Sequence, residues 1–177
     1  LLDNINAQNS VLSTQNSDQW YASPGNYFAI SGTGDDLGAS AVAVCKIDGE
    51  WASADTTAVD INGWGTDYDN YIKIYTTSAA RHVGKWDDAK YRLAVTDNYP
   101  LQVAEEYVRV EGLQLQLTQS AAGHSVINIE GQTRDAELHV SSSIIQNIAS
   151  GTSSPLGISL YDADVTGYIF NNIIYDT

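Results

Sequence analysis

The sequence has only one cysteine, three prolines and no methionine among its 177 residues. A single cysteine excludes a disulfide within the chain, and the apolar run 41–47 around Cys45 predicts a buried thiol rather than a nucleophile. No stretch approaches the ~20 consecutive apolar residues of a transmembrane helix, so membrane insertion is not expected. The N-terminal residues lack the basic and apolar segments of a signal peptide, and a processed or partial chain is expected.

Basic residues are scarce as well, because 8 Lys and Arg stand against 22 Asp and Glu, which gives a formal net charge of −14. A nucleic acid or an anionic membrane would bind against a repulsive field, so neither is an expected partner. The histidines His82, His124 and His139 show no pairwise spacing suited to zinc, and one cysteine cannot complete such a site. No resident cofactor is therefore expected, and calcium is the metal ion that the acidic chain suits best.

Helical patterns are absent too, because no segment of ten or more residues has the apolar spacing of an amphipathic helix. Short stretches instead alternate apolar and polar residues, as in Tyr71–Tyr75 and Leu113–Leu117, which predicts strands. The chain is thus predicted to be nearly all β. Further strands are predicted at 41–47, 57–61, 91–96, 107–115, 125–129, 138–145, 157–161 and 168–174.

What the second half does contain is a repeat. Val110, Val140 and Phe170 anchor similar segments at intervals of 30 residues. Such a period filled with strands predicts a right-handed parallel β-helix, in which coils of about 30 residues stack at about 4.8 Å. A β-sandwich is the competing all-β fold, since Asp48-Gly49 and Asn62-Gly63 are hairpin-like pairs that indicate an antiparallel excursion in the N-terminal third.

Two regions are predicted from this pattern. Residues 1–40 are rich in polar and turn-forming residues and are predicted to form an N-terminal arm and cap. Residues 41–177 are predicted to form the parallel β-helix.

The segments from residue 41 onward resemble a known group of proteins. They include AVDINGW (58–64), NYIKIY (70–75), RHVGKW (81–86), KYRL (90–93) and YVRVEGL (107–113). They are similar to the right-handed parallel β-helix proteins of the pectate-lyase-like superfamily, particularly its uncharacterised secreted or phage-associated members. The resemblance implies the fold and a location outside a cell or on a virion surface. It leaves the activity open, because members include polysaccharide lyases, hydrolases, phage tailspikes and structural proteins.

The candidate chemistry is sparse. Lyases of this group combine calcium-binding carboxylates with a basic residue that abstracts a proton, but the basic residues here are scattered, so no catalytic residue is assigned. Arg92 and Arg109 are expected to pair with nearby surface carboxylates such as Glu111, Glu105 or Asp97. Asp162 and Asp164 could form a glycosidase pair, although a turn of carboxylates is ordinary on so acidic a chain.

One turn is the best candidate for a metal ion. Asp67, Asp69 and Asn70 place three oxygen-bearing side chains together, and calcium takes roughly six to eight oxygen ligands. The turn lacks the full spacing of an EF-hand loop, so the prediction is limited to these three residues.

Aromatic residues are plentiful, and all four tryptophans lie in the first half of the chain. Aromatic faces line sugar-binding grooves and anchor protein interfaces, but they also fill the closed end of a solenoid. Filling of the closed end is the preferred interpretation, and ligand contact is the alternative. The residues concerned are Trp20, Trp51, Trp64 and Trp86.

The last segment forms an incomplete coil and predicts exposed strand edges, which act as templates for pairing. Its candidate assembly residues are Tyr168, Phe170, Ile173, Ile174 and Tyr175. Another molecule, or further chain, is expected to cover this end. The preferred function is therefore an extracellular, self-assembling structural solenoid, with end-to-end contact between copies giving a ring or filament. The alternative is a carbohydrate-active or carbohydrate-binding module, either a polysaccharide lyase or hydrolase fragment or a phage tailspike segment, with a polysaccharide as its partner.

Overall fold

A computed structural model describes residues 19–22, 42–62, 64–120, 123–130, 135–150, 156–161 and 164–176, with the backbone alone for residues 19–22. These residues contain strands and turns and no helix, which confirms the all-β prediction. In this part of the chain there is accordingly no helix that could cross a bilayer. The predicted N-terminal arm and cap lies outside the described residues, apart from the short strand β1 (Gln19–Ala22).

In the described residues, fourteen strands form three sheets. Sheet 1 contains, in spatial order, β1, β2 (Ala43–Ile47), β4 (Ile72–Thr76), β7 (Tyr107–Glu111), β10 (Ala136–Ser141) and β13 (Val165–Phe170). Sheet 2 contains β5 (Leu93–Thr96), β8 (Gln114–Gln119), β11 (Ile144–Ala149) and β14 (Ile173–Asp176). Sheet 3 contains β3 (Val59–Ile61), β6 (Leu101–Val103), β9 (Ser125–Ile129) and β12 (Leu156–Leu160).

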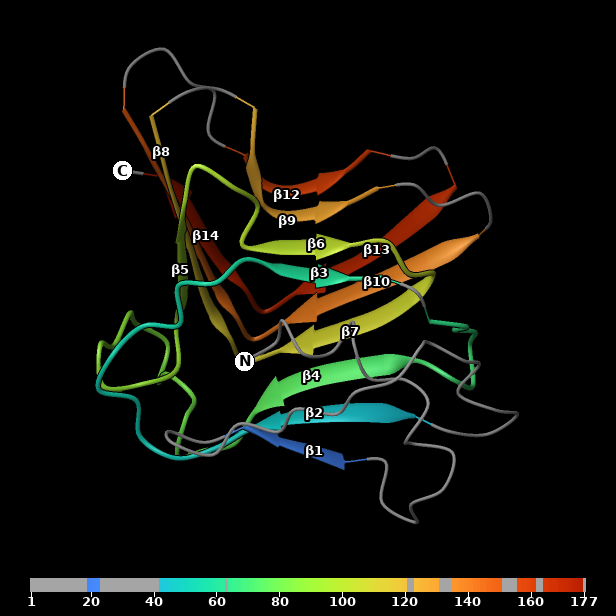
Figure 1. Cartoon of the computed structure of the whole chain (residues 1–177), viewed down its shortest axis with the longest axis horizontal. Coiled ribbons are helices and arrows are strands. Elements are labelled where there is room, and N and C mark those ends of the chain that lie inside the picture. Colours follow the sequence, from blue (N-terminus) through green and yellow to red (C-terminus); the bar gives the residue numbers. More distant parts are fainter. Residues whose placement is uncertain are drawn as a thin grey trace.

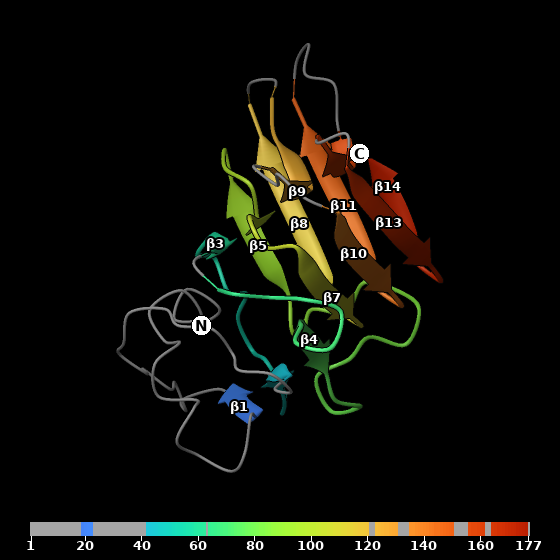
Figure 2. The ribbon, with the colours of Figure 1, turned by 90° about the vertical axis from the view of Figure 1, so that its right-hand side faces the viewer.

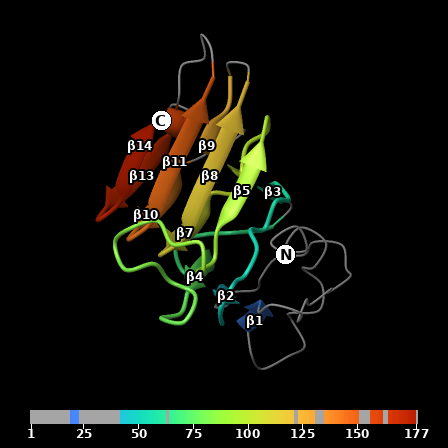
Figure 3. The ribbon, with the colours of Figure 1, turned by 90° about the vertical axis from the view of Figure 1, so that its left-hand side faces the viewer.

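The chain visits the sheets in rotation, so that β7, β8 and β9 make one turn and β10, β11 and β12 make the next. Each strand pairs in parallel with its equivalent in the neighbouring turn, as the arrows stacked in sheets 1 and 3 show (Figure 1). Figure 3 shows the same order in sheet 2, from β5 to β14. The protein is a parallel β-solenoid of about 4 turns with about 30 residues per turn, as the repeat predicts.

The predicted antiparallel excursion is wrong. Every strand pair among the described residues is parallel, including the N-terminal pair β2 and β4. At Asp48-Gly49 the chain bends only part of the way, because Gly49 takes a left-handed conformation with a φ of 82°. The chain then continues to Asp55, which forms an isolated parallel bridge with Leu93 in the position of sheet 2. A sandwich is therefore excluded for the described residues.

The register corrects one anchor of the repeat. Val110 pairs with Val140 as predicted, but Val140 pairs with Ile169 in the next coil, and Phe170 pairs with Ser141. The last interval is thus one residue shorter than the first. Because side chains alternate between the faces of a strand, this shift places Ile169 over the core and Phe170 on the outer face of sheet 1.

The interior is a stack of apolar side chains from all three sheets. Ile74, Val110 and Val140 occupy one such column, and each is at most 1% exposed. A buried aliphatic side chain of this size contributes about 1.5–3 kcal/mol relative to an exposed one, so these columns supply the main stabilisation of the coils. The core residues of β2 and β3 are buried to the same degree as those of the central coils.

The corner between sheets 1 and 2 has its own repeat. Gly112, Ser142 and Asn171 lie there in consecutive coils, and all have a positive φ, of 76°, 51° and 57°. Gly112 also has no room for a side chain, because a Cβ would lie 2.2 Å from Nε of Arg81 and 2.6 Å from Oγ1 of Thr76. The left-handed conformation turns the chain from one sheet into the next without a hairpin.

Candidate functional site

The main exposed apolar surface of the described residues lies on the last coil. We define the terminal face as the exposed large hydrophobic side chains of β12, β13 and β14 and of the residue after β12. In Figure 2, β13 and β14 lie at the end of the stack opposite β1. They are Leu156, Leu160, Tyr161, Tyr168, Ile169, Phe170, Ile173 and Ile174.

The terminal face combines two kinds of exposed apolar residue. Ile169 and Ile174 continue the interior columns of the solenoid, yet they are 41% and 48% exposed. Phe170 and Tyr168 lie on the outer side of sheet 1, where Tyr168 stacks on the ring of His139 at a centroid distance of 4.4 Å. Of the predicted assembly residues, Tyr175 differs, because it is half-buried and burial raises its pKa.

Two glycines allow the last coil to fold partly over its own core. A Cβ on Gly167 would lie 2.7 Å from Cδ1 of Leu160, and one on Gly157 would lie 2.6 Å from Cγ2 of Ile174. The two larger side chains therefore occupy the space that the glycines leave. This packing reduces the exposed apolar area but does not remove it, since Leu160 remains 36% exposed.

The backbone edges at this end are also unpaired in the chain. β12, β13 and β14 are the last strands of their sheets, and each has a strand neighbour on one side only. The corner between β13 and β14 is held from below, because Oδ1 of Asn172 accepts the amide of Ser143 at 2.9 Å and its Nδ2 donates to the carbonyl of Val140 at 2.8 Å. These two bonds tie the corner of the last coil to the coil below it.

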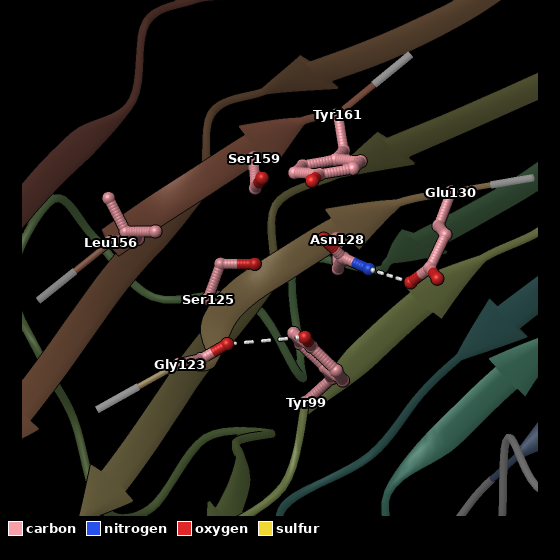
Figure 4. A pocket seen from close by; sticks show the side chains of 8 residues that line it. All are labelled: Tyr99, Gly123, Ser125, Asn128, Glu130, Leu156, Ser159 and Tyr161. Carbon is pink, nitrogen blue, oxygen red and sulfur yellow. Dashed lines mark hydrogen bonds between the residues drawn. The ribbon is translucent and has the colours of Figure 1, made fainter. Parts of the chain in front are cut away.

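A second candidate site is a shallow groove on the outer side of sheet 3, with a volume of about 380 Å³ (Figure 4). Two tyrosines lie on opposite sides of a polar floor. Tyr99 is fixed by its hydroxyl, which donates to the carbonyl of Gly123 at 3.2 Å, and by edge-to-face contact with His124. Tyr161 is 82% exposed and presents a free ring face. The lining residues are Tyr99, Gly123, Ser125, Asn128, Glu130, Leu156, Ser159 and Tyr161.

The polar groups of the groove are hydroxyls, an amide and one carboxylate. Asn128 is nearly buried, and its Nδ2 donates to Oε2 of Glu130 at 3.0 Å. None of the lining residues is basic. Among the described residues, Glu130 is the carboxylate that lines the groove.

The tryptophans lie away from this groove. Trp51 is 6% exposed and meets the ring of Tyr91 edge-to-face at 5.0 Å, while Trp64 is 7% exposed. Trp86 is half-buried and donates its indole N–H to Asp88. Trp20 lies in β1 opposite Cys45, and its side chain is outside the described residues. Trp51 and Trp64 therefore contribute to the core rather than to an open binding surface.

The predicted calcium turn is held by its own hydrogen bonds. Oδ1 of Asp67 accepts the amides of Asp69 and Asn70, and its Oδ2 accepts Nδ2 of Asn70 at 2.8 Å. These bonds lower the pKa of Asp67, that of the Asn70 side chain being the first cause. Within the described segments there is no group of three or more His, Cys, Asp or Glu residues placed to hold a metal ion. Calcium binding by Asp67, Asp69 and Asn70 stays a prediction.

Carboxylate pairing is confirmed for Arg92, with Asp88 as the partner, whereas Arg109 lies against an aromatic ring. Glu111 pairs with Arg81 at 2.8 Å and with Lys73 at 3.2 Å, whereas the guanidinium of Arg109 lies 3.4 Å from the ring centre of Tyr71. Arg92 pairs with Asp88 at 3.4 Å. Asp162 lies outside the described residues, so the pairing of Asp162 with Asp164 is not described. Arg81, Arg92 and Arg109 thus contact neighbours within the fold, and no Lys or Arg lines the groove.

Sequence reasoning missed Tyr99 and Tyr161. Tyr161 closes the predicted strand 157–161, and Tyr99 precedes Pro100, but the two are 62 positions apart in the chain. They lie on one groove because β6 and β12 both pair with β9 in sheet 3. Only the stacking order of the coils could have connected them.

The fold and these surfaces define the described part of the chain as a parallel β-solenoid with exposed apolar residues on its last coil and a shallow polar groove on sheet 3. No protein-family model matches the chain, and no curated protein or solved structure matches it either. The geometry of the described residues is therefore the basis for its function.

Proposed function

We propose that this chain is a structural β-solenoid that associates with copies of itself through the terminal face, outside a cell or on a virion surface. One observation carries the proposal. Ten large hydrophobic side chains are exposed in the described part of the chain, and eight of them belong to the terminal face. The location follows from the resemblance to secreted and phage-associated β-helix proteins and stays a prediction.

Physical chemistry supports an occupied terminal face. Contiguous exposed apolar surface is uncommon on soluble monomers and marks interaction sites, and free strand edges are templates for pairing. The terminal face carries both features on the same three strands. The net charge of −14 disfavours non-specific association through the remaining surface, so contact is favoured where the apolar residues gather.

The test is the molar mass of the purified chain by light scattering after size exclusion, over a range of concentrations. Association should be weakened at least tenfold by Ile173→Asn, because this side chain is 42% exposed on β14. Val83→Asn is the matched control, since Val83 is 79% exposed and lies outside the terminal face. A monomer at every concentration, or equal effects of the two variants, would contradict the proposal.

Salt provides an independent readout of the same contact. Added sodium chloride screens the repulsion between two copies of charge −14 and leaves apolar contact intact, so association should become tighter as salt rises. Weaker association in salt would indicate that charge attraction holds the copies together, against the proposal.

The groove on sheet 3 favours a second function, the binding of a neutral carbohydrate. Two tyrosine rings flank hydroxyl, amide and carboxylate groups, a combination that suits the apolar faces and hydroxyls of a sugar. With Glu130 and no cation in the lining, an anionic polysaccharide would be repelled. This interpretation retains the carbohydrate-binding alternative without assigning catalysis.

Calorimetric titration with cellohexaose as a neutral probe and oligogalacturonate as an anionic probe tests this second function. Tyr161→Ala should abolish binding of the neutral probe, because it removes the exposed ring of the groove. Tyr68→Ala is the control, as Tyr68 is 66% exposed and does not line the groove. Absence of heat with the neutral probe, or preference for the anionic one, would count against it.

A further inference from the structure

Sheet 1 brings together basic residues that are far apart in the sequence. Lys73 of β4 and Arg109 of β7 are register partners, so their Cα atoms lie one strand spacing apart, about 4.8 Å. Both occupy partly exposed positions that alternate with buried ones, which places the two side chains on the outer face of the sheet. The strands β4 and β7 are neighbours in the middle of sheet 1, away from both ends of the stack (Figure 1).

Arg81 reaches the same face from the connection between β4 and β5. Its Nη2 donates to Oε1 of Glu111 at 2.8 Å, and its Nε donates to Oγ1 of Thr76 at 3.2 Å. Gly112 leaves room for this side chain, because a Cβ there would lie 2.2 Å from Nε of Arg81. The guanidinium of Arg81 is therefore held in place beside the end of β7.

We define the cation cluster as Lys73, Arg81 and Arg109. It contains three of the eight Lys and Arg residues of a chain whose net charge is −14. Glu111, two residues after Arg109 on the same face, pairs with Arg81 at 2.8 Å and with Lys73 at 3.2 Å. Three cations around one carboxylate leave a local excess of two positive charges.

Arg109 is the member of the cluster whose N–H groups have no anionic partner. Within the described segments it forms no ion pair, although Glu137 lies on the neighbouring strand β10. Oε2 of Glu137 lies 3.2 Å from Nε2 of His139 instead. The guanidinium of Arg109 lies 3.4 Å from the ring centre of Tyr71, and a planar group held on a ring face keeps the donors at its edge for a further partner.

We propose that the cation cluster binds a divalent tetrahedral oxyanion, a sulfate or phosphate group, between Lys73 and Arg109. Such a group carries the charge that balances the local excess. Its oxygens point in several directions and can accept from Arg109 and from Nζ of Lys73 at the same time. The net charge of −14 repels anions from the surface as a whole, so a local group of cations is needed to hold one. This site is independent of the self-association proposed above.

A carboxylate fits the cation cluster less well than a tetrahedral oxyanion. It carries a single negative charge and would balance half of the local excess. The carboxylate of Glu111 already occupies Arg81 and Lys73 as part of the fold. A further ligand therefore needs both the second charge and an oxygen directed at Arg109.

The test is a titration of the full chain with sodium sulfate, followed through the backbone amide signals in proton–nitrogen correlation NMR spectra. Sodium chloride keeps the ionic strength constant, so that general screening does not change. The amide signals of residues 73 and 109–111 should shift and reach saturation. Arg109→Gln should weaken sulfate binding by about tenfold or more, because it removes the charge and the planar set of donors. Lys85→Gln is the matched control, since it removes one charge at an exposed residue outside the cluster, and it should leave the affinity unchanged.

Two further variants separate charge from shape. Arg109→Lys keeps the charge and loses the planar set of N–H groups, so it should bind sulfate more weakly than the wild-type chain and more tightly than Arg109→Gln. Lys73→Gln tests the other side of the site and should also weaken sulfate binding. It keeps the proposal open to contradiction if Arg109→Gln does not fold.

The outcomes are distinct. Shifts that never saturate, or equal affinities of Arg109→Gln and the wild-type chain, would overturn the site. Sodium acetate that binds as tightly as sulfate would overturn the choice of a tetrahedral anion. Inorganic phosphate and dextran sulfate, with unmodified dextran as the blank, then distinguish the sources of the group. Displacement of sulfate by phosphate alone supports a site for a free ion, and displacement by dextran sulfate supports a site for a sulfate ester on a polymer.

Discussion

Ile145 and Ile174 occupy the same position in consecutive coils of sheet 2, yet Ile145 is fully buried and Ile174 is 48% exposed. The residue type and the strand register are the same, so the difference comes only from the presence or absence of a coil above. Substitution of Ile145 therefore tests the contribution of this position to folding, and substitution of Ile174 tests its contribution to contact between molecules.

Truncation of this pair should therefore have opposite consequences. Ile145→Ala should lower the free energy of unfolding by about 2–5 kcal/mol, because it leaves a cavity in the core. Ile174→Ala should cost about 1 kcal/mol or less in the monomer and should weaken self-association. Urea unfolding at low protein concentration measures the first effect, and molar mass at high concentration measures the second. Equal losses of stability would show that the terminal face is covered in the isolated chain.

Gly112 should tolerate no side chain. Gly112→Ala forces a φ of 76° on an L-residue and places its Cβ against Arg81 and Thr76, so we expect a loss of at least about 2 kcal/mol in unfolding free energy. Gly84→Ala is the control, because Gly84 has a φ of 86° but nothing within 4 Å of its Cβ position. The stability that Gly84→Ala loses therefore reports only the cost of placing an L-residue at a positive φ. Thermal unfolding measures the loss of unfolding free energy in both variants. Equal losses would refute the steric argument.

Acid should weaken the link between Arg81 and Glu111. The side-chain hydrogen bond from Arg81, followed by that from Lys73, holds the pKa of Glu111 below its ordinary value, so folding favours the carboxylate. The stabilisation is present above the unfolded-state pKa and is lost as pH falls through the lower folded-state pKa. Glu111→Gln should flatten the acid side of the Tm profile, whereas substitution of the exposed Glu50 by Gln should leave it unchanged. An unchanged profile in Glu111→Gln would contradict this assignment.

The thiol of Cys45 should report global unfolding. Burial raises its pKa from the ordinary value of 9.0 to about 12, so the folded protein keeps the neutral thiol at pH 8. The unfolded chain ionises first as pH rises, and the stability contributed by the neutral thiol is therefore lost between about pH 9 and 12. Reaction with a chromogenic disulfide reagent at pH 8 should follow the urea unfolding curve. Rapid reaction in native buffer would show that β2 opens locally.

The sequence predicts the solenoid well where strands are long and periodic. The repeat of Val110 and Val140 reports real stacking, because the interior of every coil needs an apolar residue at the same position. Phe170 is misplaced by one residue, since the similarity between the segments 138–145 and 168–174 does not reveal that the last interval is shorter. Register depends on the length of the preceding turn, which the pattern alone does not fix.

Alternation of apolar and polar residues does not predict strands as short as three or four residues. β6 has three residues, Leu101–Val103, and becomes a strand because Val59 lies on one side of it and Ile127 on the other. β1 was expected to lie in a turn-rich segment, yet it pairs in parallel with β2. In both elements the neighbouring strands provide the hydrogen bonds that local preference does not supply.

Of the two candidate sites, one could be predicted from the repeat and the other could not. Exposure of the terminal coil follows from the repeat, and four of the five residues named from the sequence lie on the terminal face. The groove does not follow, because Tyr99 and Tyr161 belong to turns whose positions depend on three coils at once. The partners of Glu111 were also missed, since Arg81 reaches it from the long connection between β4 and β5.

The left-handed corner at Gly112, Ser142 and Asn171 has a consequence for how order is lost. Each of these residues fixes a bend that places the next strand in register only while the neighbouring coil is folded. Each coil is stabilised by contact with the coils on either side of it. Asn171 belongs to the coil that has support on one side only. Amide hydrogen exchange should therefore be fastest in β13 and β14 and slow progressively toward β7, so that the isolated molecule opens from one end, and pairing with a second copy removes the end from which opening starts.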